Sequence, residues 1–197
     1  MERLTTSEYY QRPGSWSSDG KTVAFVEGHP GDTGNDIAVL DTHSGRVKPF
    51  LNSQFNEVYP DFSPDGRWLA FTSDESKRDE VYVQPFPGPG MKYQVSSEGG
   101  VQPLWARNGK ELFYRWQDQV WVVDVQTDGG FRASKPRLLF EKAGYSGVVI
   151  PVRGYDLSLD GRRFLMVKDE QRKPTPVTEM ILVQNWFEEL KRLLPTK

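Results

Sequence analysis

The sequence contains no cysteine, and His29 and His43 are its only histidines among 197 residues. A chain without cysteine has no disulfide framework, no thiolate-ligated metal and no cysteine nucleophile. The two histidines are 14 residues apart, a separation that matches no helical pair of zinc ligands. We therefore expect no metal site and no cofactor in this chain.

An excess of charge of one sign is also missing. There are 25 Lys and Arg residues against 27 Asp and Glu residues, which gives a formal net charge of -2. A nucleic-acid-binding domain needs a clear excess of basic residues to neutralise phosphates. No run approaches the ~18 apolar residues of a membrane span, and Met1 is not followed by the apolar core of a signal peptide. We expect a soluble domain with no nucleic-acid partner and no membrane insertion.

Turn-forming and aromatic residues, by contrast, are abundant. The chain has 18 Gly and 14 Pro residues, and 13% of it is aromatic. Many aromatic residues together with many turn formers are typical of short strands joined by tight turns. The composition predicts an all-β protein.

An internal repeat is the main signal in the sequence. Four segments share an aromatic residue or leucine followed three residues later by Asp-Gly or Asn-Gly, and they occupy residues 16–20, 62–66, 105–109 and 157–161. Their glycines are 46, 43 and 52 residues apart, close to the ~40–45 residues of a propeller blade. Asp-Gly and Asn-Gly supply the positive φ angles that a tight hairpin requires. We expect each aromatic residue or leucine to end the innermost strand of a blade.

A common order of strands follows each of these turns. We expect a first apolar strand at residues 21–26, 67–71, 110–114 and 162–167. A second is expected at residues 36–40, 80–83, 120–125 and 180–183, and a weaker outer strand at 46–51, 93–96 and 136–140. A single blade cannot bury both of its faces, so stacking of blades must supply the core.

These segments resemble the TolB-like propeller repeat, an aromatic residue followed by Ser-Pro-Asp-Gly, a basic residue and an apolar strand. Residues 62–67 match the pattern fully. The other repeats depart from it at Ser18, at Ala106 to Asn108, and at Leu157 and Leu159. The resemblance implies a β-propeller of four TolB-like blades, at residues 10–55, 56–100, 101–142 and 150–184.

The two ends of the chain bear on whether the ring closes. Residues 1–9 read as an outer strand that completes the last blade and closes a four-bladed ring, with blades occupying 1–184. Alternatively the chain is an arc of a larger propeller, whose open edges invite self-association. In residues 185–197 the apolar residues Trp186, Leu190, Leu193 and Leu194 form the stripe of a short amphipathic helix, which we expect to cap the last blade or to dock a partner.

This ending also resembles the C-terminus of bacterial multidomain proteins, including serine/threonine kinases, that carry TolB-like propellers. The resemblance implies a kinase-associated propeller, periplasmic or otherwise extracytoplasmic, that forms the C-terminal part of a longer protein. The chain itself has no glycine-rich phosphate loop and no kinase catalytic motif.

The sequence contains two segments that resemble parts of catalytic motifs, and neither is complete. Gly20-Lys21-Thr22 resembles the end of a phosphate loop, but the same glycine-plus-base step recurs in every repeat. The segment at 144–147 lacks the last glycine of a nucleophile elbow, because residue 148 is Val. We therefore expect a non-enzymatic binding or sensing module that takes a protein or peptide partner.

The best candidates for ligand contact precede the signature turns, near the innermost strands and the propeller channel. They are Tyr59, Asp61, Arg153 and Tyr155. Two alternatives stay open at this point. One is a hydrolase-type enzyme in which channel carboxylates such as Asp61 and Asp156 pair for acid–base work. The other is a structural spacer for an upstream catalytic domain.

Overall fold

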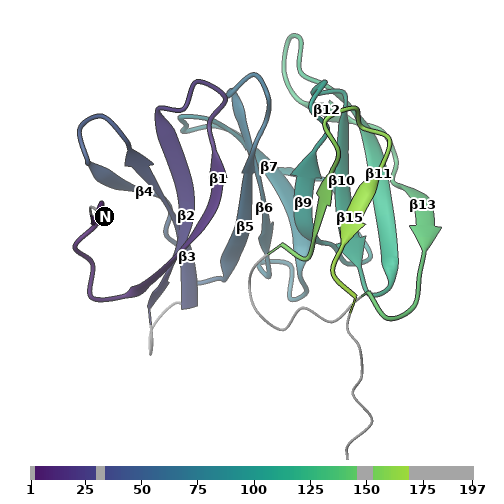
Figure 1. Ribbon diagram of the computed structural model, residues 1–197, viewed down its shortest axis with the longest axis horizontal. Coiled ribbons are helices and arrows are strands. Elements are labelled where there is room, and N and C mark those ends of the chain that lie inside the picture. The colour runs from purple at the N-terminus through teal and green to yellow at the C-terminus, as the bar shows by residue number, and fades with distance from the viewer. Residues whose placement is uncertain (1–2, 30–33, 146–152, 169–197) are drawn as a thin grey trace, which may run out of the picture.

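The computed structural model describes residues 3–29, 34–145 and 153–168 (Figure 1). These residues form fifteen β-strands arranged in antiparallel sheets that follow one another in chain order. Within the described ranges, no helix has the length and apolar character needed to cross a membrane. The expected all-β architecture is therefore confirmed for this part of the chain.

The first two sheets are regular four-stranded blades in which each strand pairs with the next. The first blade contains β1 (Tyr10–Trp16), β2 (Thr22–His29), β3 (Gly34–Asp41) and β4 (Val47–Leu51). The second blade contains β5 (Glu57–Phe62), β6 (Trp68–Ser73), β7 (Glu80–Pro85) and β8 (Tyr93–Gln94). Each blade thus runs from an innermost strand to an outer one.

The third sheet follows the same order but divides its outer position between two short strands. It contains β9 (Val101–Trp105), β10 (Glu111–Trp116), β11 (Gln119–Gln126), β12 (Arg132–Ala133) and β13 (Arg137–Glu141), with both β12 and β13 paired to β11. The fourth sheet is described for two strands, β14 (Tyr155–Leu157) and β15 (Phe164–Met166). The strand expected at 180–183 and the helix expected within 185–197 lie outside the described residues.

The signature segments form hydrogen-bonded turns, which explains their residue types. The glycines at positions 20, 66, 109 and 161 have φ angles of 69°, 69°, 69° and 70°. In the second blade the Ser63 hydroxyl donates to Asp65 and accepts the Trp68 N–H at 3.0 Å. The first and fourth blades repeat both bonds. The third has alanine at the serine position and lacks both, but it keeps the backbone bonds of the turn and the bond from the Lys110 N–H to Asn108 Oδ1. The departure at Ala106 therefore removes two hydrogen bonds without changing the turn.

Three of the four core clusters lie between neighbouring blades, and the fourth belongs to the first blade alone. Between the second and third blades, Trp68 and Trp105 both pack on Phe131. The centroid of the Phe131 ring lies 5.4 Å from that of Trp68 and 6.3 Å from that of Trp105. Between the third and fourth blades, Phe113 meets Phe164 at 5.3 Å. Burial of these faces requires neighbouring blades, as the repeat predicted.

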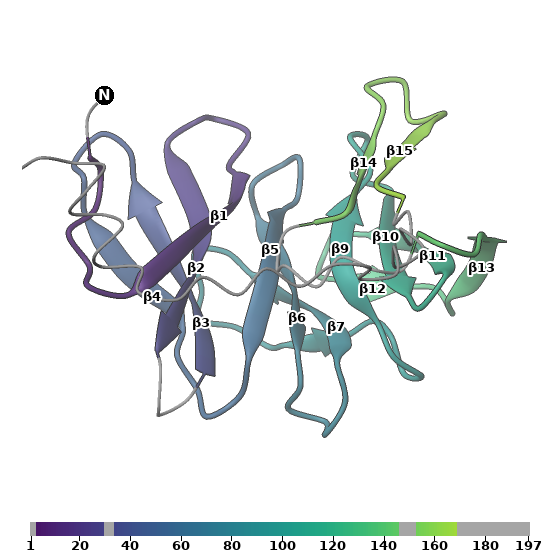
Figure 2. The ribbon, with the colours of Figure 1, turned by 60° about the horizontal axis from the view of Figure 1, so that its bottom comes forward.

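The four sheets form an open row in the described residues. Both views place the first sheet at one end, with the third and fourth sheets toward the other (Figures 1 and 2). Residues 3–9 form no strand there, and β1 begins at Tyr10 within the first blade. Because the expected partner strand at 180–183 lies outside the described residues, ring closure stays a prediction.

Candidate functional site

The innermost strands of the second, third and fourth blades carry the candidate site. Tyr59 on β5 and Gln102 on β9 occupy equivalent positions, each directly before a proline, and have φ angles of 56° and 57°. The register of β5 against β6 shifts between Val58 and Asp61, which marks a β-bulge. A positive φ is uncommon outside glycine, and bulges re-aim side chains near functional sites. The backbone here is shaped to turn Tyr59 and Gln102 toward the neighbouring blade.

Asp61 is the centre of the site. Its Oδ1 accepts a hydrogen bond from the Arg153 guanidinium at 2.7 Å, and its Oδ2 accepts the Trp105 backbone N–H at 2.8 Å. The side chain is buried, and burial raises the pKa of the Asp61 carboxyl, while the positive charge of Arg153 and the Trp105 N–H act in the opposite direction. One carboxylate thereby joins the second, third and fourth blades.

Gln102 makes a second set of inter-blade bonds beside Asp61. Its Oε1 accepts the Gly154 N–H at 3.1 Å, and its backbone carbonyl accepts the Tyr155 hydroxyl at 2.8 Å. Its own N–H donates to Thr72 Oγ1 at 3.2 Å. Burial raises the pKa of Tyr59, while the nearby Gln102 side chain acts in the opposite direction. Burial raises the pKa of Tyr155 as well, so both phenols stay protonated near neutral pH.

The structure brings together all of the residues singled out from the sequence. Asp61 and Arg153 form an ion pair, Tyr155 donates to Gln102, and Tyr59 lies near the same glutamine. Gln102 itself was missed. Its signal was its place in the repeat, because it aligns with Tyr59 and also precedes a proline.

A cleft of about 390 Å³ opens above Asp61 and Arg153, where the innermost strands of all four blades end. Trp16 stands on its rim with 59% of its surface exposed, and the exposed Arg107 lies on the rim as well. Asp156, also exposed, contributes a carboxylate to the lining. The cleft therefore combines a buried ion pair at its base with aromatic and charged groups at its mouth.

The two channel carboxylates differ in their surroundings. Asp61 is buried and ion-paired with Arg153, whereas Asp156 is exposed and accepts the N–H of Leu157 at 2.8 Å. General acid–base catalysis by a carboxyl pair requires groups free to exchange protons with a substrate. The bonds of Asp61 hold it between blades and leave it poorly placed for that role.

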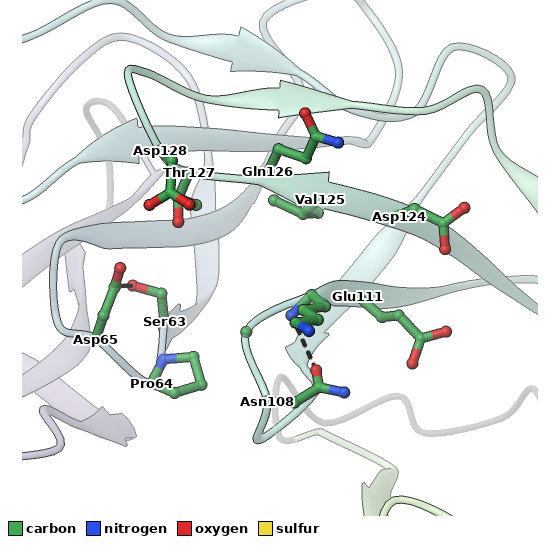
Figure 3. Close-up of a pocket in the computed structure, with 12 residues that line it drawn as sticks. Ser63, Pro64, Asp65, Asn108, Glu111, Asp124, Val125, Gln126, Thr127 and Asp128 are labelled. Carbon is green, nitrogen blue, oxygen red and sulfur yellow. Dashed lines mark hydrogen bonds between the residues drawn. The ribbon is translucent and has the colours of Figure 1, made fainter.

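A larger cleft, of about 960 Å³, lies between the signature turn of the second blade and the third blade (Figure 3). Of the five charged residues that line it, Asp65, Glu111 and Asp124 form ion pairs with neighbours of the same chain. Asp65 pairs with Arg67, at 2.8 Å, and Arg137 lies 3.3 and 3.7 Å from Glu111 and Asp124. Because these pairs are satisfied within the fold, we regard the smaller cleft as the better candidate site.

Solved structures with a similar arrangement of strands include TolB propellers. TolB from Acinetobacter baumannii matches with a TM-score of 0.66 and 20% identity, over 86% of this chain and 40% of that protein. A TolB-like protein from Agrobacterium tumefaciens gives a TM-score of 0.62 and 22% identity, over 82% and 61% of the two chains. An oligogalacturonate lyase in complex with manganese gives 0.58 and 13% identity, over 83% and 46%. This chain thus has the fold of a TolB-like β-propeller.

Sequence comparison adds relatives but no family assignment. No family model matches the chain. The uncharacterized peptidase YuxL of Bacillus subtilis (strain 168) is 27% identical over 103 residues, which are 49% of this chain and 16% of YuxL. The uncharacterized protein Atu1656 of Agrobacterium fabrum (strain C58 / ATCC 33970) is 28% identical over 98 residues, 50% of this chain and 33% of that protein. The matched regions span at most a third of these relatives.

Proposed function

We propose that this chain is a non-enzymatic binding module that takes a protein or peptide partner in the cleft above Asp61 and Arg153. The observation that carries the proposal is the meeting of four innermost strands at one cleft whose mouth displays Trp16 and Arg107. Tryptophan and arginine are enriched among the residues that dominate binding energy at protein interfaces. A cleft that gathers both is suited to an extended peptide or a protruding loop.

The base of the cleft supports recognition better than catalysis. The hydrogen bonds of Asp61 and Gln102 to the third and fourth blades fix the cleft before any partner arrives. A preorganised site loses less conformational entropy on binding. The exposed Asp156 and Arg107 then supply one charge of each sign for orienting a partner. In this proposal the buried pair is scaffold and the exposed residues make the contacts.

We further propose that the module is the C-terminal part of a longer bacterial protein that acts outside the cytoplasm. The resemblance of its sequence ending to kinase-linked propellers supports this placement. Fractionation of the native host, with an antibody raised against this chain, gives both the size of the parent protein and its compartment. A parent no larger than this chain, found in the cytosol, would contradict the placement.

The binding proposal is tested by selecting peptides from a random display library on the purified chain and measuring their affinity by calorimetry. Trp16→Ala and Arg107→Ala should each weaken a selected peptide by roughly tenfold or more, equivalent to about 1.4 kcal/mol. Arg132→Ala serves as the matched control, because Arg132 is exposed on β12 away from the cleft. Equal losses in all three variants, or a failure to select any peptide, would count against the cleft as a peptide site.

A further inference from the structure

A separate pocket of about 570 Å³ lies at the end of the third blade opposite its signature turn. Three aromatic side chains line it, Tyr114 and Trp116 from β10 and Trp121 from β11. Gln117 and Gln119, from the hairpin that joins these strands, add two amides. The pocket shares no lining residue with the cleft above Asp61.

The indole ring of Trp121 is held in place by a chain of hydrogen bonds. Its Nε1 donates to Gln119 Oε1 at 3.1 Å, and Gln119 Nε2 donates to Glu141 Oε2 at 3.0 Å. The ring is nearly parallel to that of its cross-strand neighbour Tyr114, with an interplanar angle of 7°. Two aromatic planes therefore face the same way on one side of the blade, and the Trp121 ring remains partly exposed.

Trp116 is positioned by an unusual backbone contact. Gly99 has a φ of 103°, and a Cβ added there would come within 2.2 Å of the Trp116 ring. Gly99 is in turn anchored by its N–H, which donates to the buried Glu80 at 2.9 Å. At the hairpin tip Gln117 has a φ of 53°, a conformation uncommon for residues other than glycine. The two-residue turn between β10 and β11 requires a positive φ at this position, and it brings the side chains of Gln117 and Gln119 to the edge of the pocket.

We propose that this pocket is a carbohydrate-binding site that takes a neutral oligosaccharide. The C–H faces of a pyranose ring pack against partly exposed aromatic planes, of which Trp116 and Trp121 provide two. Its hydroxyls both donate and accept hydrogen bonds, and so do the amides of Gln117 and Gln119. Aromatic side chains combined with a few placed polar groups are typical of small-ligand sites, and this pocket has three of the former beside its two amides.

The charges at the pocket favour a neutral ligand. Glu98 and Lys135 are its only ionisable groups besides Tyr114 among the lining residues, and they carry opposite signs. Burial and the nearby negative charges of Glu80 and Glu98 raise the pKa of Tyr114, which keeps its hydroxyl neutral. An anionic sugar would meet no excess of positive charge here. The hydroxyl groups of a neutral sugar can hydrogen bond to the amides of Gln117 and Gln119 and need no positive charge in the pocket.

The test is a titration of the whole chain with a panel of hexasaccharides, monitored by amide NMR shifts and tryptophan fluorescence. The panel contains β-1,4-glucose, α-1,4-glucose, β-1,4-N-acetylglucosamine and β-1,4-mannose oligomers as neutral probes, and α-1,4-galacturonate as the anionic probe. We expect at least one neutral member to bind with shifts centred on residues 114–121. Trp121→Ala should weaken that binding by roughly tenfold or more.

Two further variants separate recognition from folding. Gln119→Leu removes the acceptor for the Trp121 indole and should weaken the oligosaccharide without lowering the thermal midpoint by more than a few degrees. Trp16→Ala, in the other cleft, should leave oligosaccharide binding unchanged. The proposal is overturned if no neutral probe binds at millimolar concentration, if only the galacturonate binds, or if Trp121→Ala binds as well as the parent. Selection of a peptide that requires Trp121 but not Trp16 would make the pocket a peptide site instead.

Discussion

The guanidinium of Arg153 and the carboxylate of Asp61 form a 2.7 Å ion pair between the fourth and second blades, 92 residues apart in the chain. The same carboxylate holds the backbone of the intervening third blade through the Trp105 N–H. An equivalent bond joins the first two blades, where the Phe62 N–H donates to the Ser15 hydroxyl at 2.9 Å. In the third blade this position is Leu104, which offers no acceptor, and the Leu157 N–H is instead satisfied by its own neighbour Asp156.

The ion pair should be sensitive to the loss of one partner. Arg153→Met leaves the buried Asp61 charge uncompensated, which should lower the free energy of unfolding by about 3–5 kcal/mol. The double variant Asp61→Asn with Arg153→Met keeps an acceptor for the Trp105 N–H and removes both charges. It should recover most of the loss, as measured by urea denaturation. If the double variant is as unstable as Arg153→Met, the loss of stability does not come from the uncompensated charge of Asp61.

A buried carboxyl should make stability depend on pH. Burial raises the pKa of Glu57 to about 7 from an ordinary value of 4.5, although the Ser53 hydroxyl donates to it; the negative charges of Asp36 and Glu75 raise it further. The folded protein therefore holds this proton more tightly than the unfolded chain. The contribution of protonated Glu57 to the free energy of unfolding is complete below pH 4.5 and is lost as the pH rises through 7. The loss should reach about 3 kcal/mol.

Urea midpoints measured between pH 5 and pH 8.5 test this dependence. Glu57→Gln, which keeps the shape and carries no charge, should flatten the profile and be more stable than the parent at pH 8.5. Glu98→Gln serves as the control, since Glu98 is exposed. A parent protein that is equally stable at both ends of the range would show that Glu57 is not held protonated.

The third signature turn lacks the serine of the other three, and restoring it should stabilise the protein. In Ala106→Ser the new hydroxyl can donate to Asn108 and accept the Glu111 N–H, as Ser63 does for Asp65 and Trp68. We expect a gain of about 0.5–1.5 kcal/mol in the free energy of unfolding. The converse change Ser63→Ala should cost about 1–3 kcal/mol, because the buried Trp68 N–H loses its acceptor. Thermal melts of the two variants test this prediction. The melting temperature should rise in Ala106→Ser and fall in Ser63→Ala.

The interface between the second and third blades depends on Trp105. This residue is 4% exposed and packs in the cluster that includes Trp68 and Phe131. Trp105→Ala should reduce the free energy of unfolding by about 3–5 kcal/mol. The exposed Trp16, at the equivalent position of the first blade, is the matched control and should lose far less on truncation to alanine. Nearly equal losses in the free energy of unfolding of the two variants would contradict the packing described above.

The amino-acid sequence determined the blade pattern by itself, because the turns are local. Asp-Gly after an aromatic residue specifies a hairpin through positive φ and short hydrogen bonds, and each innermost strand ends at the predicted residue, Trp16, Phe62, Trp105 or Leu157. The first apolar strands appear as β2, β6, β10 and β15, and the described second strands as β3, β7 and β11. The repeat also predicted that Tyr59, Asp61, Arg153 and Tyr155 would lie near one another, because all four come from the innermost strands or directly precede them, and these strands lie side by side in neighbouring blades.

Only the tertiary structure decided which groups pair across blades. The bond from Arg153 to Asp61 spans 92 residues, and no periodicity in the sequence distinguishes it from a contact with Asp156. The alignment of Gln102 with Tyr59 did not show its role, which depends on a left-handed backbone that points its amide at the fourth blade. Likewise only the tertiary structure places the partly exposed rings of Trp116 and Trp121 beside one pocket. Local hydrogen bonds and strand period are encoded residue by residue, whereas these contacts depend on how whole blades lie against one another.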